Sequence, residues 1–289
     1  MKSIIRERLV CPECLSKLKI NEKQIICCKC KSTFSRVAGI PDLLTKKDKK
    51  ELKKEMKFSR RYVGSGVIYR LLKKITKNII GLKTPRVPNL ILNRNGILPA
   101  KYLKDKSILL NIGGLKKSNK NKINLDIIKN EHTDLIANVE KIPLKDNSVD
   151  FVSALAVLHH VENPHTAINE IKRVLKKGGY IYTTDCFFYP YHPVPRDIHR
   201  WTREGYKSLF KDFKEIELKN IHGPTTTLLK VLQIYLPILF SFNLDTIYAI
   251  EYVIFSYLLY PFKFLDLLLK DHKKADYIAG GFVFLGKKK

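Results

Sequence analysis

The alternation of apolar and polar positions is clearest between residues 138 and 186. An apolar run at 149–154 follows a polar turn and predicts a strand that is buried on both faces of a sheet. After Asn163 and Pro164, which suit the start of a helix, apolar residues recur at helical spacing as far as the pair Gly178 and Gly179. Residues 180–184 are β-branched and aromatic. The segment therefore predicts a right-handed strand, helix and strand unit with parallel strands.

Further elements of a parallel sheet are predicted on both sides of this unit. Residues 107–112 and 122–126 have the pattern of the first two strands, 204–210 that of a helix, and 213–221 and 278–286 that of the last two strands. Only 113–121 lie between the first two strands, which is too short for an ordinary crossover helix. We expect that helix to be lost or reduced to a turn. The fold class is therefore α/β, with a Rossmann-like sheet.

Residues 225–271 interrupt this order before the last strand. They are rich in Leu, Ile, Phe and Tyr, and their uncharged runs, 231–244 and 252–262, are too short to span a bilayer. Buried helices that complete the core are the favoured interpretation of this helical insertion. A helical hairpin over a substrate cleft, a dimer interface and an interfacial membrane element are the alternatives.

Cysteines crowd into the start of the chain. Cys11 and Cys14 form one C-x2-C pair, and Cys27 and Cys30 form a second one, with two short β-like pieces between the pairs. Four thiolates at this spacing are typical of a zinc ribbon, whose closed site makes the metal structural. Cys28 leaves the second pair ambiguous. A segment this small needs the metal in order to fold, so residues 1–45 are predicted to form a zinc ribbon with structural Zn²⁺.

The charge balance is strongly basic. Lys and Arg number 54 against 27 Asp and Glu, a net charge of +27, which suits an anionic partner such as RNA, a membrane surface or a phosphorylated substrate. Lys is frequent throughout the chain, so charge alone does not select nucleic acid. The first residues form no apolar leader segment. The protein is therefore expected to be cytoplasmic, or peripheral to the cytoplasmic face of the membrane.

The segment KIPLKDNSVDFVSALAVLHHVENPHTAINEIKRVLKKGGYIY resembles the central part of class I S-adenosylmethionine (SAM) dependent methyltransferases. The similarity combines an acidic turn, the fourth strand, a His pair, an amphipathic helix, Lys-x-Gly-Gly and the fifth strand. Residues 34–44 resemble the tail of a zinc ribbon that precedes this domain in some members. The resemblance implies a zinc ribbon at 1–45, a helical linker or lid at 46–100, and a SAM-methyltransferase domain at 101–289 with its insertion at 225–271.

The resemblance also implies where SAM binds. The expected cofactor-binding residues are Asn111, Gly113, Gly114, Asp126, Asn138, Val139 and Ala154. The family usually shows an acidic residue and G-x-G-x-G in the first turn, whereas this chain has Asn111-Ile-Gly-Gly-Leu115. Asp126 is the best single cofactor residue, because a carboxylate at the tip of the second strand accepts both ribose hydroxyls.

The loop at 185–202 resembles the H-x-x-P-x-D-x-x-R-x-T loop of this methyltransferase branch. It leaves the carboxyl end of a central strand, where open α/β sheets keep their sites. Methyl transfer mainly aligns donor and acceptor and needs at most one base. His192, Asp197 and His199 are the candidates for that base, and a purely structural loop is the alternative. The pair His159 and His160 is expected to be structural.

The expected activity is methyl transfer from SAM to an acceptor that the sequence does not identify. The insertion favours a lipid- or saccharide-linked substrate, whereas the ribbon and the charge favour RNA. A catalytically degenerate scaffold that binds a membrane or nucleic acid is the rival, because of Asn111 and the shortened glycine turn. The charge run at 46–57 predicts a solvated helix. Residues 67–80 and 90–98 have weak helical patterns; the resemblance implies that such a segment covers the cofactor, and plain packing helices are the alternative.

Overall fold

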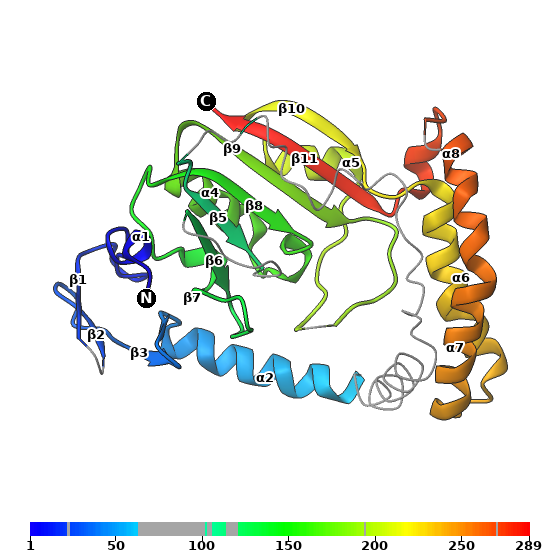
Figure 1. Cartoon of the computed structure of the whole chain (residues 1–289), viewed down its shortest axis with the longest axis horizontal. Helices are drawn as coiled ribbons and strands as arrows, with labels where there is room; N and C mark the ends of the chain where they lie inside the picture. The colour runs from blue at the N-terminus through cyan, green and yellow to red at the C-terminus, as the bar shows by residue number, and fades with distance from the viewer. Residues whose placement is uncertain (22–23, 63–101, 103–105, 114–120, 194, 270) are drawn as a thin grey trace.

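The computed structural model describes residues 1–21, 24–62, 102, 106–113, 121–193, 195–269 and 271–289 (Figure 1). Their strands form one 11-stranded sheet, in the order β1-β2-β3-β4-β7-β6-β5-β8-β9-β11-β10. The cysteine-rich N-terminal strands and the central strands thus belong to one hydrogen-bonded sheet.

The central strands confirm the predicted Rossmann-like arrangement. They are β5 (Leu109–Ile112), β6 (Lys122–Asp126), β7 (Leu135–Ile136), β8 (Val149–Leu155), β9 (Leu175–Cys186), β10 (Phe213–Asn220) and β11 (Gly281–Lys288). Strands β5 to β9 run parallel, and β11 inserts antiparallel between β9 and β10. Because β5 pairs with β6 on one side and β8 on the other, the direction of chain progress through the sheet reverses there.

The apolar pattern explains how these strands are covered. Successive residues of β8 point to opposite faces, so Val152 joins the large core cluster and Phe151 a smaller cluster with Tyr182, Val283 and Leu285. Helix α4 (Pro164–Val174) buries its predicted apolar stripe against the first cluster, and α5 (Arg203–Leu209) also contributes to that cluster. Both faces of the sheet are therefore packed.

The predicted end of helix α4 is wrong. Helix α4 ends at Val174 rather than at the glycine pair, because β9 already begins at Leu175. Gly178 lies inside that strand with a φ of +75°, a conformation that suits glycine. The predicted segments 67–80 and 90–98 lie outside the described residues, and so does most of the short β5 to β6 connection.

The N-terminal region adds four short strands and a long helix. Its elements are α1 (Ser3–Arg6), β1 (Leu18–Ile20), β2 (Ile25–Cys27), β3 (Thr33–Val37), β4 (Ile40–Asp42) and α2 (Lys46–Tyr62). Strand β4 pairs in parallel with β7, with Asp42 opposite Ile136. Helix α2 starts with a capping box, in which Thr45 and Asp48 exchange hydrogen bonds from backbone N–H to side chain. The charged run is thus helical, as predicted.

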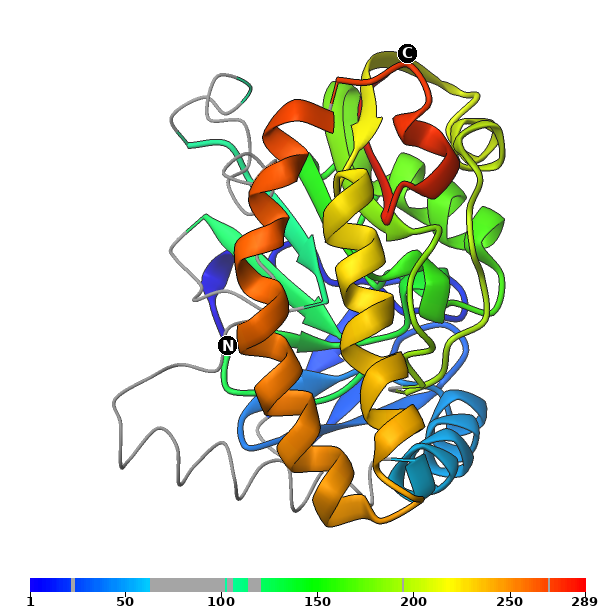
Figure 2. The same cartoon turned by 90° about the vertical axis from the view of Figure 1, so that its right-hand side faces the viewer.

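The insertion forms a helical hairpin before the last strand (Figure 2). It comprises α6 (Pro224–Phe240), α7 (Asp245–Leu259), the 3-10 turn η5 (Tyr260–Leu265) and α8 (Asp266–Leu269). The favoured interpretation as buried core helices is wrong, because large side chains such as Ile238 and Leu258 are 61% and 60% exposed. The hairpin stands on the side toward which the carboxyl ends of β8 and β9 point (Figure 1).

Candidate active site and metal centre

A cavity of about 580 Å³ lies at the carboxyl ends of the parallel strands. Residues at the ends of β5, β6, β7, β8 and β9 form one side of its wall. This is the edge at which the strand order reverses, and ligands of open α/β sheets bind at that point. The volume falls within the range of about 300–1,000 Å³ that is typical of small-molecule sites. Helix α2, the 185–202 loop and helix α6 supply the opposite side.

Asp126 lies on the cavity wall at the end of β6, where the sequence predicted it. Its Oδ1 accepts a hydrogen bond from the backbone N–H of Ile128 at 3.0 Å, and its Oδ2 accepts one from the side chain of Asn130 at 2.9 Å. Burial raises the pKa of this carboxyl group. The two donors fix the carboxylate at the tip of the strand, and lone pairs remain for a ligand.

Asn138 and Val139 also lie on the cavity wall, just after β7. The side-chain oxygen of Asn138 accepts from the N–H of Glu140 at 2.9 Å, and its Nδ2 donates to Asp48 at 2.9 Å. Burial would raise the pKa of Asp48, but hydrogen bonds from Thr45 and Asn138 outweigh burial and lower it. The end of β7 is therefore tied to the first turn of α2.

The glycine turn is partly described. Gly113 lies on the cavity wall with a φ of +82°, and a Cβ atom there would lie 2.9 Å from Val157 Cγ2. A residue with a side chain would thus be strained at this position. Gly114 lies outside the described residues. Ala156, which also lines the cavity, has a positive φ of 55°. Such a conformation is uncommon for a residue with a side chain and is often found at functional sites.

Two predicted cofactor residues lie away from the cavity. Asn111 is buried within the sheet, where its amide donates to Asn124 at 3.1 Å and accepts from the Ser153 hydroxyl at 2.9 Å. Ala154 is fully buried, and the next residue, Leu155, lines the cavity instead. Asn111 thus joins three neighbouring strands.

The three predicted bases occupy different surroundings. His192 lines the cavity, and partial desolvation lowers its pKa, which favours the neutral imidazole. Asp197 does not line the cavity; it pairs with Arg200, whose hydrogen bonds outweigh desolvation and lower the pKa of the carboxyl group. His199 donates from Nε2 to the Val161 carbonyl at 3.1 Å. Of the three, His192 is the one that reaches the cavity.

The pair of histidines after β8 is anchored by polar contacts. The Nδ1 of His159 hydrogen-bonds to the carboxylate of Asp185, which also accepts the backbone N–H groups of Leu158 and Cys186. The Nδ1 of His160 donates to the Arg196 carbonyl, and burial lowers the pKa of His160 to about 4. These contacts hold the 185–202 loop against the end of β8.

A polar cluster on the far side of the cavity was not predicted from the sequence. Lys230, from α6, lies with its Nζ 3.4 Å from His222 Nε2 and 4.4 Å from the centre of the Tyr189 ring. Burial lowers the pKa of Lys230 to about 8 and holds that of His222 well below its usual range. Cys186 lines the same wall, and burial raises the pKa of its thiol to about 12. A lysine in an apolar insertion offered no sequence signal for this role.

Helix α2 contributes acidic residues to the same cavity. Glu51 and Glu55 line it one turn apart, and Glu55 pairs with Arg196 of the 185–202 loop at 3.2 Å. Burial raises the pKa of Glu55. The charge run that the sequence assigned to a solvated linker therefore forms part of the cavity wall.

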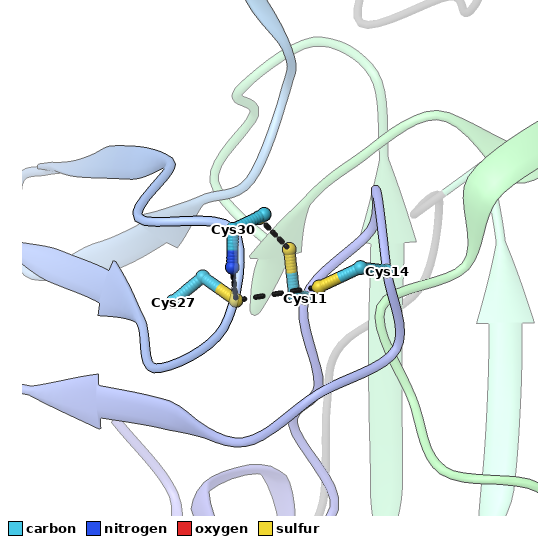
Figure 3. Close-up of side chains that lie close together, drawn as sticks. All are labelled: Cys11, Cys14, Cys27 and Cys30. Atoms are coloured by element: carbon cyan, nitrogen blue, oxygen red, sulfur yellow. Dashed lines mark hydrogen bonds between the residues drawn. The ribbon is translucent and has the colours of Figure 1, made fainter.

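The four predicted metal ligands converge at the N-terminus (Figure 3). Cys11, Cys14, Cys27 and Cys30 place their sulfur atoms within 4.8 Å of one another, with Cys11 and Cys30 3.6 Å apart and Cys14 and Cys27 3.4 Å apart. Zn–S bonds of about 2.3 Å put the sulfurs of a tetrahedral site about 3.8 Å apart, so the cluster fits Zn²⁺. Hydrogen bonding with Ser16 lowers the pKa of Cys14 to about 6, which favours the thiolate. Cys28 is exposed and outside the cluster, which resolves the ambiguity of the second pair.

Comparison with known families adds to this geometry. The family model described as "Methyltransferase domain" matches residues 112–183, from the end of β5 into β9. The matched span includes Asp126, Asn138 and most of the strand ends that form the cavity. The chain contains a class I SAM-dependent methyltransferase domain. The family implies SAM as the cosubstrate of this domain.

Similar proteins match parts of this chain. An uncharacterized protein of Methanocaldococcus jannaschii is 33% identical over 100 residues, which are 32% of this chain and 49% of that protein. An uncharacterized methyltransferase of Schizosaccharomyces pombe is 41% identical over 46 residues, 16% of each chain. The chain thus spans about half or less of the length of these relatives. Among solved structures, a Haemonchus contortus phosphoethanolamine N-methyltransferase is 15% identical with a TM-score of 0.46, over 81% of this chain and 60% of that one.

Proposed function

We propose that this protein transfers a methyl group from SAM to an acceptor that enters the same cavity. One observation carries the proposal: the matched methyltransferase segment places Asp126 and Asn138 on the wall of a cavity at the reversal point of the sheet. When bound, SAM supplies an electrophilic methyl group on a positively charged sulfur. The chain has to hold this donor, exclude water and align the acceptor with the methyl carbon.

The strand ends are proposed to hold the donor. The fixed carboxylate of Asp126 would accept the two ribose hydroxyls, and Asn138, oriented by Glu140 and Asp48, would meet the adenine edge. Gly113 lets the backbone of the first turn approach the ligand closely. These groups orient the donor and take no proton.

The opposite wall is proposed to activate the acceptor. A nucleophile that carries a proton has to lose it as its bond to the methyl carbon forms and the bond from carbon to sulfur breaks, with the electron pair remaining on sulfur. Lys230 has a pKa of about 8, so part of its population is the neutral amine near neutral pH and can take that proton. His192 also lines the cavity, and its neutral imidazole is the second candidate base. Asp197 is less suited, because Arg200 holds it as a carboxylate away from the cavity.

The chemistry of the cavity wall also bears on the acceptor class. Lys230 reaches the cavity from helix α6, and the outer face of that helix is apolar. An acceptor carried on a lipid suits such a wall better than RNA does, because RNA contacts depend on exposed cationic and aromatic side chains. We also propose that the four-cysteine cluster holds structural Zn²⁺, which the sulfur spacing supports.

Calorimetric titration with SAM and with its demethylated product tests the proposal. We expect micromolar binding to the metal-loaded protein. In Asp126→Ala the affinity should fall about 100-fold, because two hydrogen bonds to a charged group contribute about 1.5 kcal/mol each. Asp212→Ala, which removes an exposed carboxylate paired with Lys172, is the matched control and should bind as the wild type does.

Two outcomes would contradict this assignment. Absence of binding by the folded wild-type protein to either ligand would favour a scaffold that has lost its cofactor. Unchanged affinity in Asp126→Ala would leave SAM binding in place but reject the carboxylate as the ribose acceptor.

A further inference from the structure

The hairpin of α6 and α7 has its apolar residues on the outside. Large apolar side chains cover its outer surface, its tip and the turn that follows. The exposed ones are Leu228, Tyr235, Ile238, Leu239, Phe240, Phe242, Leu244, Ile250, Ile254, Tyr257, Leu258, Phe262, Phe264, Leu265, Leu267, Leu268 and Leu269. Soluble proteins rarely leave so many large apolar side chains of one hairpin exposed to water, and apolar surfaces of this kind mark sites of protein or membrane contact.

Small and polar residues are prominent among those buried in the hairpin, beside Leu229 and a stacked pair formed by Phe240 and Phe255. Gln233 of α6 and Ser256 of α7 are 7% and 1% exposed, and the Gln233 amide donates to the Ser256 hydroxyl. Ala249 is buried in the same hairpin. A water-soluble helix pair has the reverse arrangement, with apolar residues inside and polar residues outside. Small residues at the contact, polar side chains that join the helices and large apolar residues facing outward are typical of helix pairs in lipid.

Two of the charged groups within the hairpin are turned inward. Asp266 is 1% exposed and accepts the backbone N–H groups of Thr225 and Thr226 at the start of α6, at 2.7 and 2.9 Å. Lys263 is buried, with its Nζ 3.7 Å from the centre of the Tyr260 ring. The continuous helical stretch Asp245–Leu269 is long and apolar enough to cross a membrane by length and composition. At 1.5 Å per residue its 25 residues would extend over about 37 Å if they were fully α-helical.

Cationic and aromatic residues border this apolar surface. Lys273 and Lys274 are exposed just after α8, close in sequence to the strongly exposed Tyr277. The end of α2, which carries the exposed Lys54 and Lys57, lies near the tip of the hairpin in both views (Figures 1 and 2). Lysine and tyrosine are favoured where a protein meets the headgroup region, and each lysine near an anionic bilayer contributes about 1 kcal/mol.

We propose that the outer face of the α6 and α7 hairpin docks on an anionic lipid bilayer. The apolar side chains would enter the boundary of the hydrocarbon region, and the flanking lysines would meet the headgroups. A second copy of the chain is a poorer occupant, because two chains of net charge +27 repel each other. Lys230 lies in the second turn of the same α6, so docking places the cavity beside the membrane surface.

Vesicle flotation of the full chain tests this proposal. Vesicles of phosphatidylcholine with one third phosphatidylglycerol should carry the protein to the top of the gradient, and a large part should stay bound at 0.5 M salt because apolar contact is not screened. Ile238→Asp combined with Leu258→Asp should lower the bound fraction at least tenfold. The control, Ile216→Asp combined with Val37→Asp, changes exposed apolar residues elsewhere and should float as the wild type does.

A second measurement guards against a folding defect in the double variant. Leu268 is 80% exposed, so Leu268→Trp should fold, and its fluorescence should shift to the blue and be quenched by brominated lipid. Membrane docking does not depend on methyl transfer, so SAM titration without vesicles tests the two proposals separately. The proposal is overturned if the wild type stays at the bottom of the gradient, if binding vanishes at 0.5 M salt, or if the hairpin variant floats undiminished. A stable dimer that excludes vesicles would also overturn it.

Discussion

The two sides of the cavity differ in how their side chains are held and in what they can do. On the sheet side, Asp126 and Asn138 follow the ends of parallel strands and are fixed by backbone N–H groups within two residues of their own positions. On the covering side, Tyr189, His222 and Lys230 come from separate segments and meet through side-chain contacts. The first arrangement suits the binding of a constant donor. The second suits the role that we propose for it, proton transfer from the acceptor.

Removal of the proposed Zn²⁺ should have the largest effect, and it should act on the sheet side. Strand β4 of the cysteine-rich N-terminal segment pairs with β7, which leads into Asn138, and α2 follows β4 directly. Ribbons of this size depend on their metal for folding, so Cys27→Ser or a strong chelator should unfold residues 1–45 and lower the affinity for SAM at least tenfold. Zinc content, circular dichroism and calorimetry on the same sample measure this.

Cys28→Ser is the matched control for that experiment, because Cys28 is exposed and outside the cluster. Its zinc content and SAM affinity should equal those of the wild type. Full SAM affinity in a zinc-free Cys27→Ser protein would show that the ribbon does not support the sheet side.

Titration of Lys230 should give the next largest effect, and it concerns the covering side. Burial lowers the pKa of Lys230 from 10.5 to about 8 in the folded chain. Between these values the unfolded chain binds more protons, so the stability of the wild type should rise with pH relative to Lys230→Met. The difference in unfolding free energy should change by up to about 3 kcal/mol between pH 7 and pH 10.5. Denaturant unfolding across this pH range measures the difference.

Lys214→Met removes an exposed lysine and should show no such pH dependence. Lys230→Met should also retain SAM affinity within twofold, because the donor is proposed to contact the other wall. A large loss of SAM affinity in Lys230→Met would contradict the proposal that the sheet side binds the donor and the covering side acts only on the acceptor.

The smallest effect is expected at the contact between the two sides. Asp48 caps α2 through Thr45 and accepts from Asn138, so Asp48→Ala should cost about 1 kcal/mol of unfolding free energy and weaken SAM binding a few-fold. Thermal unfolding and calorimetry measure both quantities. Asp48→Asn keeps a capping oxygen and should lie between Asp48→Ala and the wild type. Lys50→Ala, on the exposed face of α2, should change neither.

The sheet side could be predicted from the sequence because its signals are local. The pattern of 122–126 places Asp126 at a strand end, and two C-x2-C pairs place four thiols together. Asn111 shows the limit of this approach, because position in a strand does not tell whether a side chain reaches the cavity or a neighbouring strand. The covering side depends on packing between distant segments. Lys230 lies in an insertion and Glu55 in a charge run, and neither position reveals that its helix closes over the strand ends.

Lys230 connects the two proposals, because membrane docking of the hairpin would change the environment of the proposed base. The same α6 carries this amine and several of the exposed apolar side chains. Lipid hydrocarbon against the outer face of α6 would displace water near the amine and favour its neutral form further, whereas the anionic headgroups, which favour the charged form, would meet the flanking lysines instead. In protein bound to vesicles, a larger fraction of Lys230 would then be the neutral amine at a given pH than in the same protein in solution. Its rate of methyl transfer would rise on arrival at the membrane, before any acceptor had been concentrated there.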